Sequence, residues 1–163
     1  MARVLVAGFG NVLRGDDGFG VEVVQRLHGV ALPEGTTLLE VGTGGIALAQ
    51  ELLTRYDRVV VVDATERGGR PGALYVLHVD SVEELRSIDM HMAVPSRALG
   101  LAQTLGVLPR EVYLVGCEPG KVDDLEMTLS AAVEAAVAPA IEQIQRLLTL
   151  DPIPGVPHDT ATR

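Results

Sequence analysis

The chain of 163 residues has the length of one ordinary domain, and its composition excludes several classes of protein. The formal net charge of −9 repels phosphate backbones and anionic lipid, so neither nucleic acid nor a membrane is expected as a partner. Cys117 is the only cysteine, which excludes an internal disulfide and a cysteine cluster for zinc and is typical of a reducing compartment. The N-terminus lacks the pattern of a signal peptide and no long apolar run follows, so a cytoplasmic protein is expected.

Strand-like and helix-like segments alternate in the first part of the chain. Residues 3–7, 36–41 and 58–62 are short runs rich in β-branched and other apolar residues, which predict strands. Between them, apolar residues recur at helical spacing around 21–27 and 46–53, which predicts two helices. Glycine-rich loops follow the first two strands, as is typical of strand-to-helix turns.

The second part of the chain adds two more strands and further helices. Residues 73–79 predict a strand that follows 58–62 after a loop too short for a helical crossover. This strand is therefore expected at an edge of the sheet, or antiparallel to the strand before it. The remaining predicted elements are a short helix with a capping box at Ser81, a helix over 96–105, a strand over 111–115 and a long helix over 129–148 that contains Pro139.

This order predicts a single three-layer α/β domain in residues 1–150, with a mostly parallel, twisted sheet of about five strands and helices on both faces. Residues 151–163 are rich in proline and polar residues, so a flexible C-terminal tail is expected. Ligands of such sheets bind beyond the carboxyl ends of the strands, near the switch in strand order. That rule selects the loop after Ala7, the loop after Val41 and the residue after Val62.

The first glycine loop raises the hypothesis of a nucleotide-binding site. Gly8 and Gly10 follow a strand and precede a helix, but Leu13 stands where a dinucleotide-binding fingerprint has glycine. Asp16 and Asp17 lie where a pyrophosphate would meet the helix N-terminus, and they would repel it. No nucleotide is therefore expected. One of the two acids fits the role of an N-cap or a first-turn acid.

A third acid and a histidine suggest a metal site. Asp63 follows the strand 58–62, and two carboxylates about 5 Å apart repel by roughly 3 kcal/mol at an effective dielectric of about 20. Such a pair requires a bound proton or a cation between the carboxylates. His91 lies in an irregular segment from which a loop can direct its ring to the strand ends, although a surface or core histidine is the alternative. Asp17, Asp63 and His91 together would suit zinc, nickel or a similar divalent ion with open positions.

Several stretches carry a family resemblance that extends from residue 3 to about 148. The stretch GFGNVLRGDDGFGVEVVQRL resembles the opening of the [NiFe]-hydrogenase maturation proteases, whose signature is G-x-G-N-x-L-x-x-D-[DE]-x-x-G. The order and spacing of the later stretches make the resemblance specific. These are GTGG, VVVVDA, DMHMAVPSRALGLAQTLG, VYLVGCEPG and LSAAVEAAVAPAIEQI.

The resemblance implies an endopeptidase that removes the C-terminal extension of a hydrogenase large-subunit precursor after nickel insertion. It assigns metal binding and catalysis to Asp17, Asp63 and His91, with nickel carried transiently by the substrate. Some relatives have Glu at the first of these positions, so Asp17 would reach less far. A monomer is expected. Whether metal-bound water or a carboxylate base drives hydrolysis stays open. Asp16 is expected to be an N-cap, and the alternatives are that it orients the loop or acts as a base.

Other interpretations remain beside this one. Glycines 42, 44 and 45 either let the peptide approach the backbone closely or simply form a strand-to-helix turn. The same three site residues would also serve a non-catalytic metal- or partner-binding module of hydrogenase assembly. A nucleotide-dependent enzyme with a degenerate glycine loop is a weaker alternative. Cys117 is weaker still as a nucleophile, since a small core residue is the simpler role.

Overall fold

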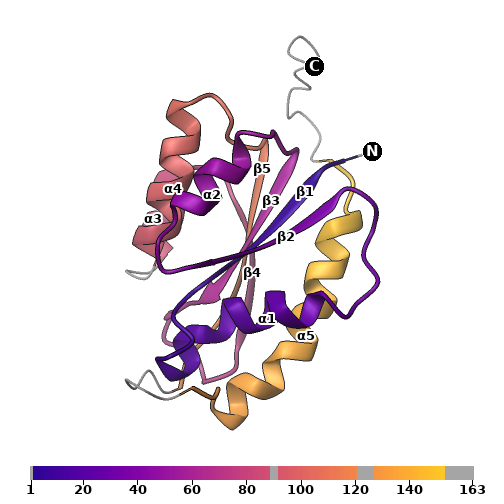
Figure 1. Ribbon diagram of the computed structural model, residues 1–163. Helices are drawn as coiled ribbons and strands as arrows, with labels where there is room; N and C mark the ends of the chain where they lie inside the picture. Colours follow the sequence, from indigo (N-terminus) through magenta and orange to yellow (C-terminus); the bar gives the residue numbers. More distant parts are fainter. Residues whose placement is uncertain (1, 89–91, 121–126, 153–163) are drawn as a thin grey trace.

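The computed structural model describes residues 2–88, 92–120 and 127–152, which form a five-stranded sheet between two layers of helices (Figure 1). The strand order is β2-β1-β3-β5-β4. Four strands are parallel, namely β1 (Val4–Phe9), β2 (Thr36–Gly42), β3 (Arg58–Ala64) and β5 (Glu111–Cys117). The edge strand β4 (Leu74–Val79) pairs antiparallel with β5.

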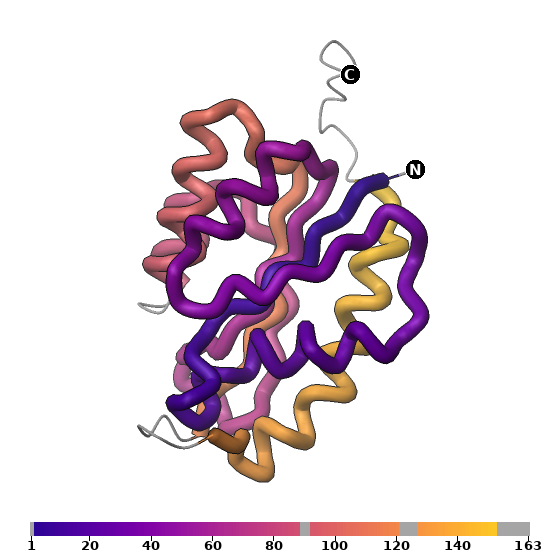
Figure 2. Tube along the Cα trace, viewed as in Figure 1, coloured from indigo at the N-terminus to yellow at the C-terminus, as the bar shows by residue number. Residues whose placement is uncertain are grey.

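The helices divide between the two faces of the sheet, as the chain trace also shows (Figure 2). One face carries α1 (Phe19–Leu27) and α5 (Ala131–Thr149). The other carries α2 (Ile46–Leu52), α3 (Val82–Ile88) and α4 (Ala93–Thr104). A short 3-10 helix, η1 (Gly15–Gly18), leads into α1. The predicted three-layer α/β architecture with a mostly parallel sheet of five strands is confirmed.

Two hydrophobic cores result from the alternation of side chains along the strands. Val4 and Val6 of β1 face α1 and α5, whereas Leu5 and Ala7 face α2 and α4. Every residue of β1 and β3 is buried. Strands covered on both faces need apolar side chains at successive positions, which explains the uninterrupted valine run of β3.

Three boundaries or pairings differ from the sequence-based prediction. The edge position of β4 is confirmed, but its partner is β5 rather than β3, because β5 inserts between them. Strand β3 extends one residue beyond Asp63 to Ala64, and Asp63 itself pairs with Gly116. Helix α4 begins at Ala93, since Pro95 is compatible with a first helical turn.

The smaller predictions for helices have mixed outcomes. The Ser81 hydroxyl accepts a hydrogen bond from the Glu84 amide at 3.1 Å, which confirms the cap on α3. Helix α5 runs through Pro139 as one element. Within the described part of the chain, no helix has the length and apolarity to cross a membrane. The predicted tail falls mainly on residues 153–163, which lie outside the described residues.

The strand order places a switch point between β1 and β3. The connection from β1 through α1 leads to β2 at one edge, whereas the chain after β3 continues to the other side of the sheet. Neighbouring connections therefore diverge at the carboxyl ends of β1 and β3, which is where such sheets bind ligands. The first loop and Asp63 both lie at this point.

Candidate functional site

Two glycines let α1 lie directly on the backbone of the sheet. A Cβ on Gly20 would lie 2.1 Å from the carbonyl oxygen of Val62 and 2.5 Å from that of Phe9. A Cβ on Gly8 would lie 2.4 Å from the carbonyl oxygen of Gly20. No side chain fits at either contact, so both positions need glycine. This close packing holds η1 and the first turn of α1 against the carboxyl ends of β1 and β3.

Gly10 lies between the two acids that the sequence selected. Its φ of +125° belongs to the region that favours glycine. A Cβ built on Gly10 would lie 1.8 Å from the carbonyl oxygen of Asp17 and 3.7 Å from Oδ1 of Asp63. The structure therefore brings the Asp17 backbone and the Asp63 carboxylate to the same glycine.

The two acids differ in environment. Asp63 is 4% exposed and belongs to the central strand, so its position is fixed by the sheet. Asp17 is half-buried, and its Oδ2 accepts a hydrogen bond from the backbone N–H of Asn11 at 3.0 Å. That bond orients the Asp17 carboxylate toward the loop that contains Gly10. Two carboxylates are thus held at the switch point, one rigidly and one on a hydrogen-bonded turn.

His91, the third predicted ligand, lies outside the described residues. The described residues nearby are Met92, which is fully buried, and Val94 at the start of α4. A Cβ on Gly45 would lie 3.1 Å from Cγ1 of Val94, so α4 begins beside the loop after β2. Among the described residues, no three histidine, cysteine or acidic side chains are grouped as a metal site. The three-ligand set therefore stays a prediction.

Asp16 holds its turn in place through distant partners that the sequence did not reveal. Its carboxylate is fully buried and accepts hydrogen bonds from the Ser130 amide at 2.7 Å, the Ser130 hydroxyl at 2.8 Å and the Gly120 amide at 2.8 Å. Ser130 is the N-cap residue of α5, whereas Gly18 occupies that position in α1. The expectation that Asp16 caps its own helix is therefore wrong. It joins η1 to the start of a distant helix.

Glu118 is a further buried carboxylate that sequence reasoning missed. Its Oε1 accepts hydrogen bonds from the Arg67 amide at 2.8 Å, the Gly69 amide at 2.9 Å and the Tyr75 hydroxyl at 2.6 Å. Burial raises the pKa of this carboxyl, but the hydrogen bonds from Tyr75 and the loop amides outweigh burial and lower the pKa below its usual value. Glu118 directly follows β5, and the rule that selects residues beyond the carboxyl ends of parallel strands could have identified it.

Cys117 is part of the core and not a nucleophile. It is fully buried and packs in the cluster that α1 and α5 cover. Burial, followed by the nearby charges of Asp16 and Glu118, raises the pKa of the thiol to about 12. A thiol with this pKa stays protonated at neutral pH, and the thiolate is the reactive form. The core interpretation is confirmed.

The glycines of the second loop, which follows β2, differ in whether the backbone conformation requires them. Gly42 and Gly45 have φ values of +70° and +84°, so the strand-to-helix turn itself needs glycine there. Among the described residues, no atom lies within 4 Å of a Cβ added to Gly44, and the φ of Gly44 lies outside the left-handed region. Neither backbone conformation nor packing within the described residues requires glycine at position 44.

The fold and its acids define an α/β protein with a candidate site at the switch point of a five-stranded sheet, and comparison with known proteins narrows this class. Residues 21–147 match the hydrogenase maturation protease family. The hydrogenase expression/formation protein HupD of Rhizobium leguminosarum bv. viciae is 34% identical over 150 residues, which cover 90% of this chain and 74% of that protein. The hydrogenase 2 maturation protease of Escherichia coli K12 is 29% identical over 161 residues, which cover 96% of this chain and 97% of that protein.

Solved structures agree with the sequence comparison. The hydrogenase maturating endopeptidase HybD from Escherichia coli has a TM-score of 0.79 at 29% identity, covering 90% of this chain and 91% of that one. The [NiFe] hydrogenase maturation protease HybD from Thermococcus kodakarensis has a TM-score of 0.76 at 28% identity, covering 90% and 99%. The chain belongs to the hydrogenase maturation protease family, as its motifs indicated, and is by class an endopeptidase.

Proposed function

We propose that the protein removes the C-terminal extension of a [NiFe]-hydrogenase large-subunit precursor, and that it does so after nickel has been inserted. Membership of the maturation protease family supports the substrate class. The observation that carries the proposal is the approach of Asp17 and Asp63 to the same glycine, Gly10, at the switch point of the sheet. This is the position at which open α/β sheets bind their ligands.

Nickel bound to the precursor is the ligand that this site would recognise. The carboxylates of Asp17 and Asp63, with the imidazole of His91, would supply two oxygens and one nitrogen to the ion. Carboxylate and imidazole groups suit a borderline divalent ion such as nickel. A cation between two neighbouring carboxylates also removes their mutual repulsion. The nickel would belong to the substrate and remain only during cleavage, so neither a resident metal nor a nucleotide is part of the proposal.

The ion would also contribute to hydrolysis, because a bound divalent metal polarises a carbonyl group or lowers the pKa of water. The protein's own part is to position the precursor. Asp17 is held by the Asn11 amide, and Asp63 is held by the central strand. Within the described residues, Gly44 has open space beside it at the end of β2, which suits the close approach of a peptide backbone.

The test compares nickel-loaded with nickel-free precursor, with the mass of the precursor as the readout. We expect the wild-type protein to cut only the loaded form. Asp63→Asn and His91→Ala should each lower kcat/KM by at least about a thousandfold while the fold is retained. His28→Ala, at the C-cap of α1, and Asp151→Asn, exposed beyond α5, are the matched controls and should cut normally.

Each outcome bears on a different part of the proposal. Equal cleavage of loaded and nickel-free precursor would refute recognition through the metal. Near-normal turnover by Asp63→Asn or His91→Ala would remove that residue from the site. Binding of the loaded precursor without any cleavage would favour the non-catalytic module of hydrogenase assembly.

A further inference from the structure

A groove of about 370 Å³ lies between η1 and α1 on one side and residues 127–129 with the first turn of α5 on the other. Gly15 and Gly18 line one end of it, and these glycines bound the turn that carries Asp17. The groove therefore borders the turn that carries Asp17. Its volume suits a few side chains of an extended peptide.

The walls of the groove combine exposed apolar groups with an excess of negative charge. Val12 and Met127 line it and are 41% and 72% exposed. Arg26 donates to Glu22 at 2.9 Å and to Glu134 at 2.5 Å, so two carboxylates share one guanidinium. One net negative charge remains. The acidic groups are accessible, since the side chains of Glu22 and Glu134 are 34% and 49% exposed.

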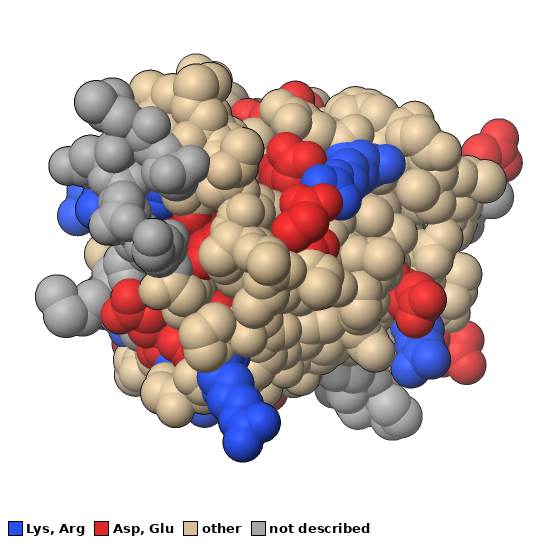
Figure 3. Space-filling model, turned by 90° about the horizontal axis from the view of Figure 1, so that it is seen from below, with Lys and Arg blue, Asp and Glu red and all other residues tan. Residues whose placement is uncertain are grey.

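The view onto the end of the molecule that holds the carboxyl ends of the parallel strands shows several groups of acidic side chains, some of them lying against basic ones (Figure 3). The two glutamates and one arginine of the groove favour a cationic group over an anionic one. A second copy of the chain is a poor occupant, because 22 acidic against 13 basic residues make the copies repel each other. The occupant must bring the positive charge.

We propose that this groove binds a segment of the hydrogenase large-subunit precursor that carries a lysine or arginine beside an apolar residue. The inference rests on the proposed function and adds a determinant of substrate choice to it. The basic side chain would approach the exposed carboxylates of Glu22 and Glu134 beside Arg26, whose single positive charge they share. The apolar neighbour would pack on Val12 and Met127. Docking in the groove would place the following part of the precursor beside Asp17.

The experiment measures binding without cleavage. Nickel-free precursor is titrated onto the Asp63→Asn protein, so that neither the metal nor turnover contributes. We expect the additional pair Glu22→Gln and Glu134→Gln to raise the Kd about tenfold at low salt, because the groove changes from net negative to net positive. The difference should shrink at high ionic strength. Glu142→Gln, an exposed acid on the same helix as Glu134, should leave the Kd unchanged.

A companion assay in the wild-type background with nickel-loaded precursor separates this inference from the proposed function. The variant that combines Glu22→Gln with Glu134→Gln should have a higher KM and an unchanged kcat. If the wild-type protein does not cleave the precursor at all, the proposed function is refuted, but the assignment of the groove is not. Equal Kd values for the paired variant and Glu142→Gln would overturn the groove assignment. Self-association of the chain that the paired variant abolishes would overturn it too, by assigning the groove to a second copy.

Discussion

Glu118 fixes the loop that follows Asp63. Three donors converge on one of its oxygens, and two of them are amides of the polar turn between β3 and β4. The Glu118 amide also donates to the Ala73 carbonyl at 2.8 Å. The carboxyl end of β3 therefore connects to a loop with a defined conformation, although that loop contains two consecutive glycines.

Replacement of Glu118 by Gln should lower the free energy of unfolding by about 2 kcal/mol at pH 7, because hydrogen bonds to a buried charge are lost. Tyr75→Phe removes one donor of the three and should cost about 1 kcal/mol. Urea denaturation of the three proteins measures both values.

The pH dependence follows from the lowered pKa of Glu118. A carboxyl whose pKa is lower in the folded state contributes stability that is present above its unfolded pKa, about 4.3, and is lost as the pH falls through the folded value. The difference between wild type and Glu118→Gln should therefore be constant from about pH 6 to 8 and shrink below about pH 4. A difference of the same size at pH 3 would contradict this role.

At the scale of elements, the 3-10 helix η1 depends on α5. Asp16 connects the two through two hydrogen bonds to Ser130, the N-cap of α5, and accepts a third from Gly120 beyond β5. The carboxylate has no exposed surface. Because Asp17 is the next residue in η1, the same bonds determine where the candidate ligand lies. A residue next to the site thus serves to position the turn.

Asp16→Asn should lower the free energy of unfolding by about 3 kcal/mol. Both oxygens of Asp16 accept hydrogen bonds, so the NH2 group of asparagine would face an N–H or O–H donor and could not accept from it. Ser130→Ala removes only the hydroxyl bond and should cost about 1 kcal/mol. Chemical denaturation compares the two variants. If Asp16→Asn costs no more than Ser130→Ala, the hydrogen bonds that the backbone amides of Gly120 and Ser130 donate to Asp16 contribute little to stability.

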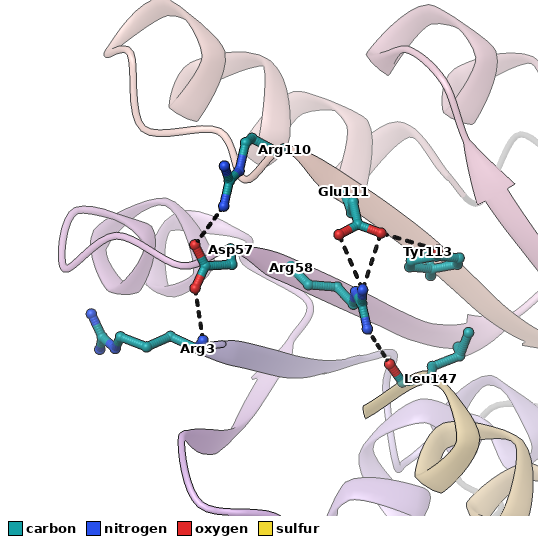
Figure 4. Close-up of polar contacts among 7 residues, drawn as sticks. All are labelled: Arg3, Asp57, Arg58, Arg110, Glu111, Tyr113 and Leu147. Carbon is teal, nitrogen blue, oxygen red and sulfur yellow. Dashed lines mark hydrogen bonds and ion pairs between the residues drawn. The ribbon is translucent and has the colours of Figure 1, made fainter. Parts of the chain in front are cut away.

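At the scale of the whole molecule, a buried ion pair lies at the end of the sheet opposite to the candidate site (Figure 4). Arg58 and Glu111 are the first residues of β3 and β5, and Nη2 of Arg58 donates to both carboxylate oxygens at 3.1 and 3.0 Å. Nη1 donates to the Leu147 carbonyl at 2.5 Å. This pair therefore joins two strands to α5. Beside it, the more exposed Asp57 pairs with Arg110 at 3.0 Å.

Glu111→Gln should lower the free energy of unfolding by about 3 kcal/mol, because it leaves the Arg58 charge buried without its partner. Asp57→Asn should cost less than about 1 kcal/mol, as is usual for partly exposed pairs. Well below the unfolding temperature, both variants should cut loaded precursor with normal kcat, since the site lies at the other end of the sheet. A fall in kcat without a loss of stability would refute this separation.

The sequence by itself determined the layer architecture, the five strands and the places of Asp17 and Asp63. These features follow from local patterns, because side-chain periodicity reflects which faces of a strand or helix are buried. The rule that ligands bind beyond strand ends also needs only the element order. Motif order further indicated the family, which the comparisons confirm. The role of His91 stays a prediction.

Only the tertiary structure decided the partner of β4, the function of Asp16 and Glu118, and the pairing of Arg58 with Glu111. Asp16 lies 104 and 114 residues from its partners, and no local pattern encodes which distant donors reach a buried carboxylate. Such contacts depend on strand order and on close packing at glycines such as Gly20. The burial of a polar group selects its partners only after the chain has folded, because an unpaired polar group is costly only where water is excluded.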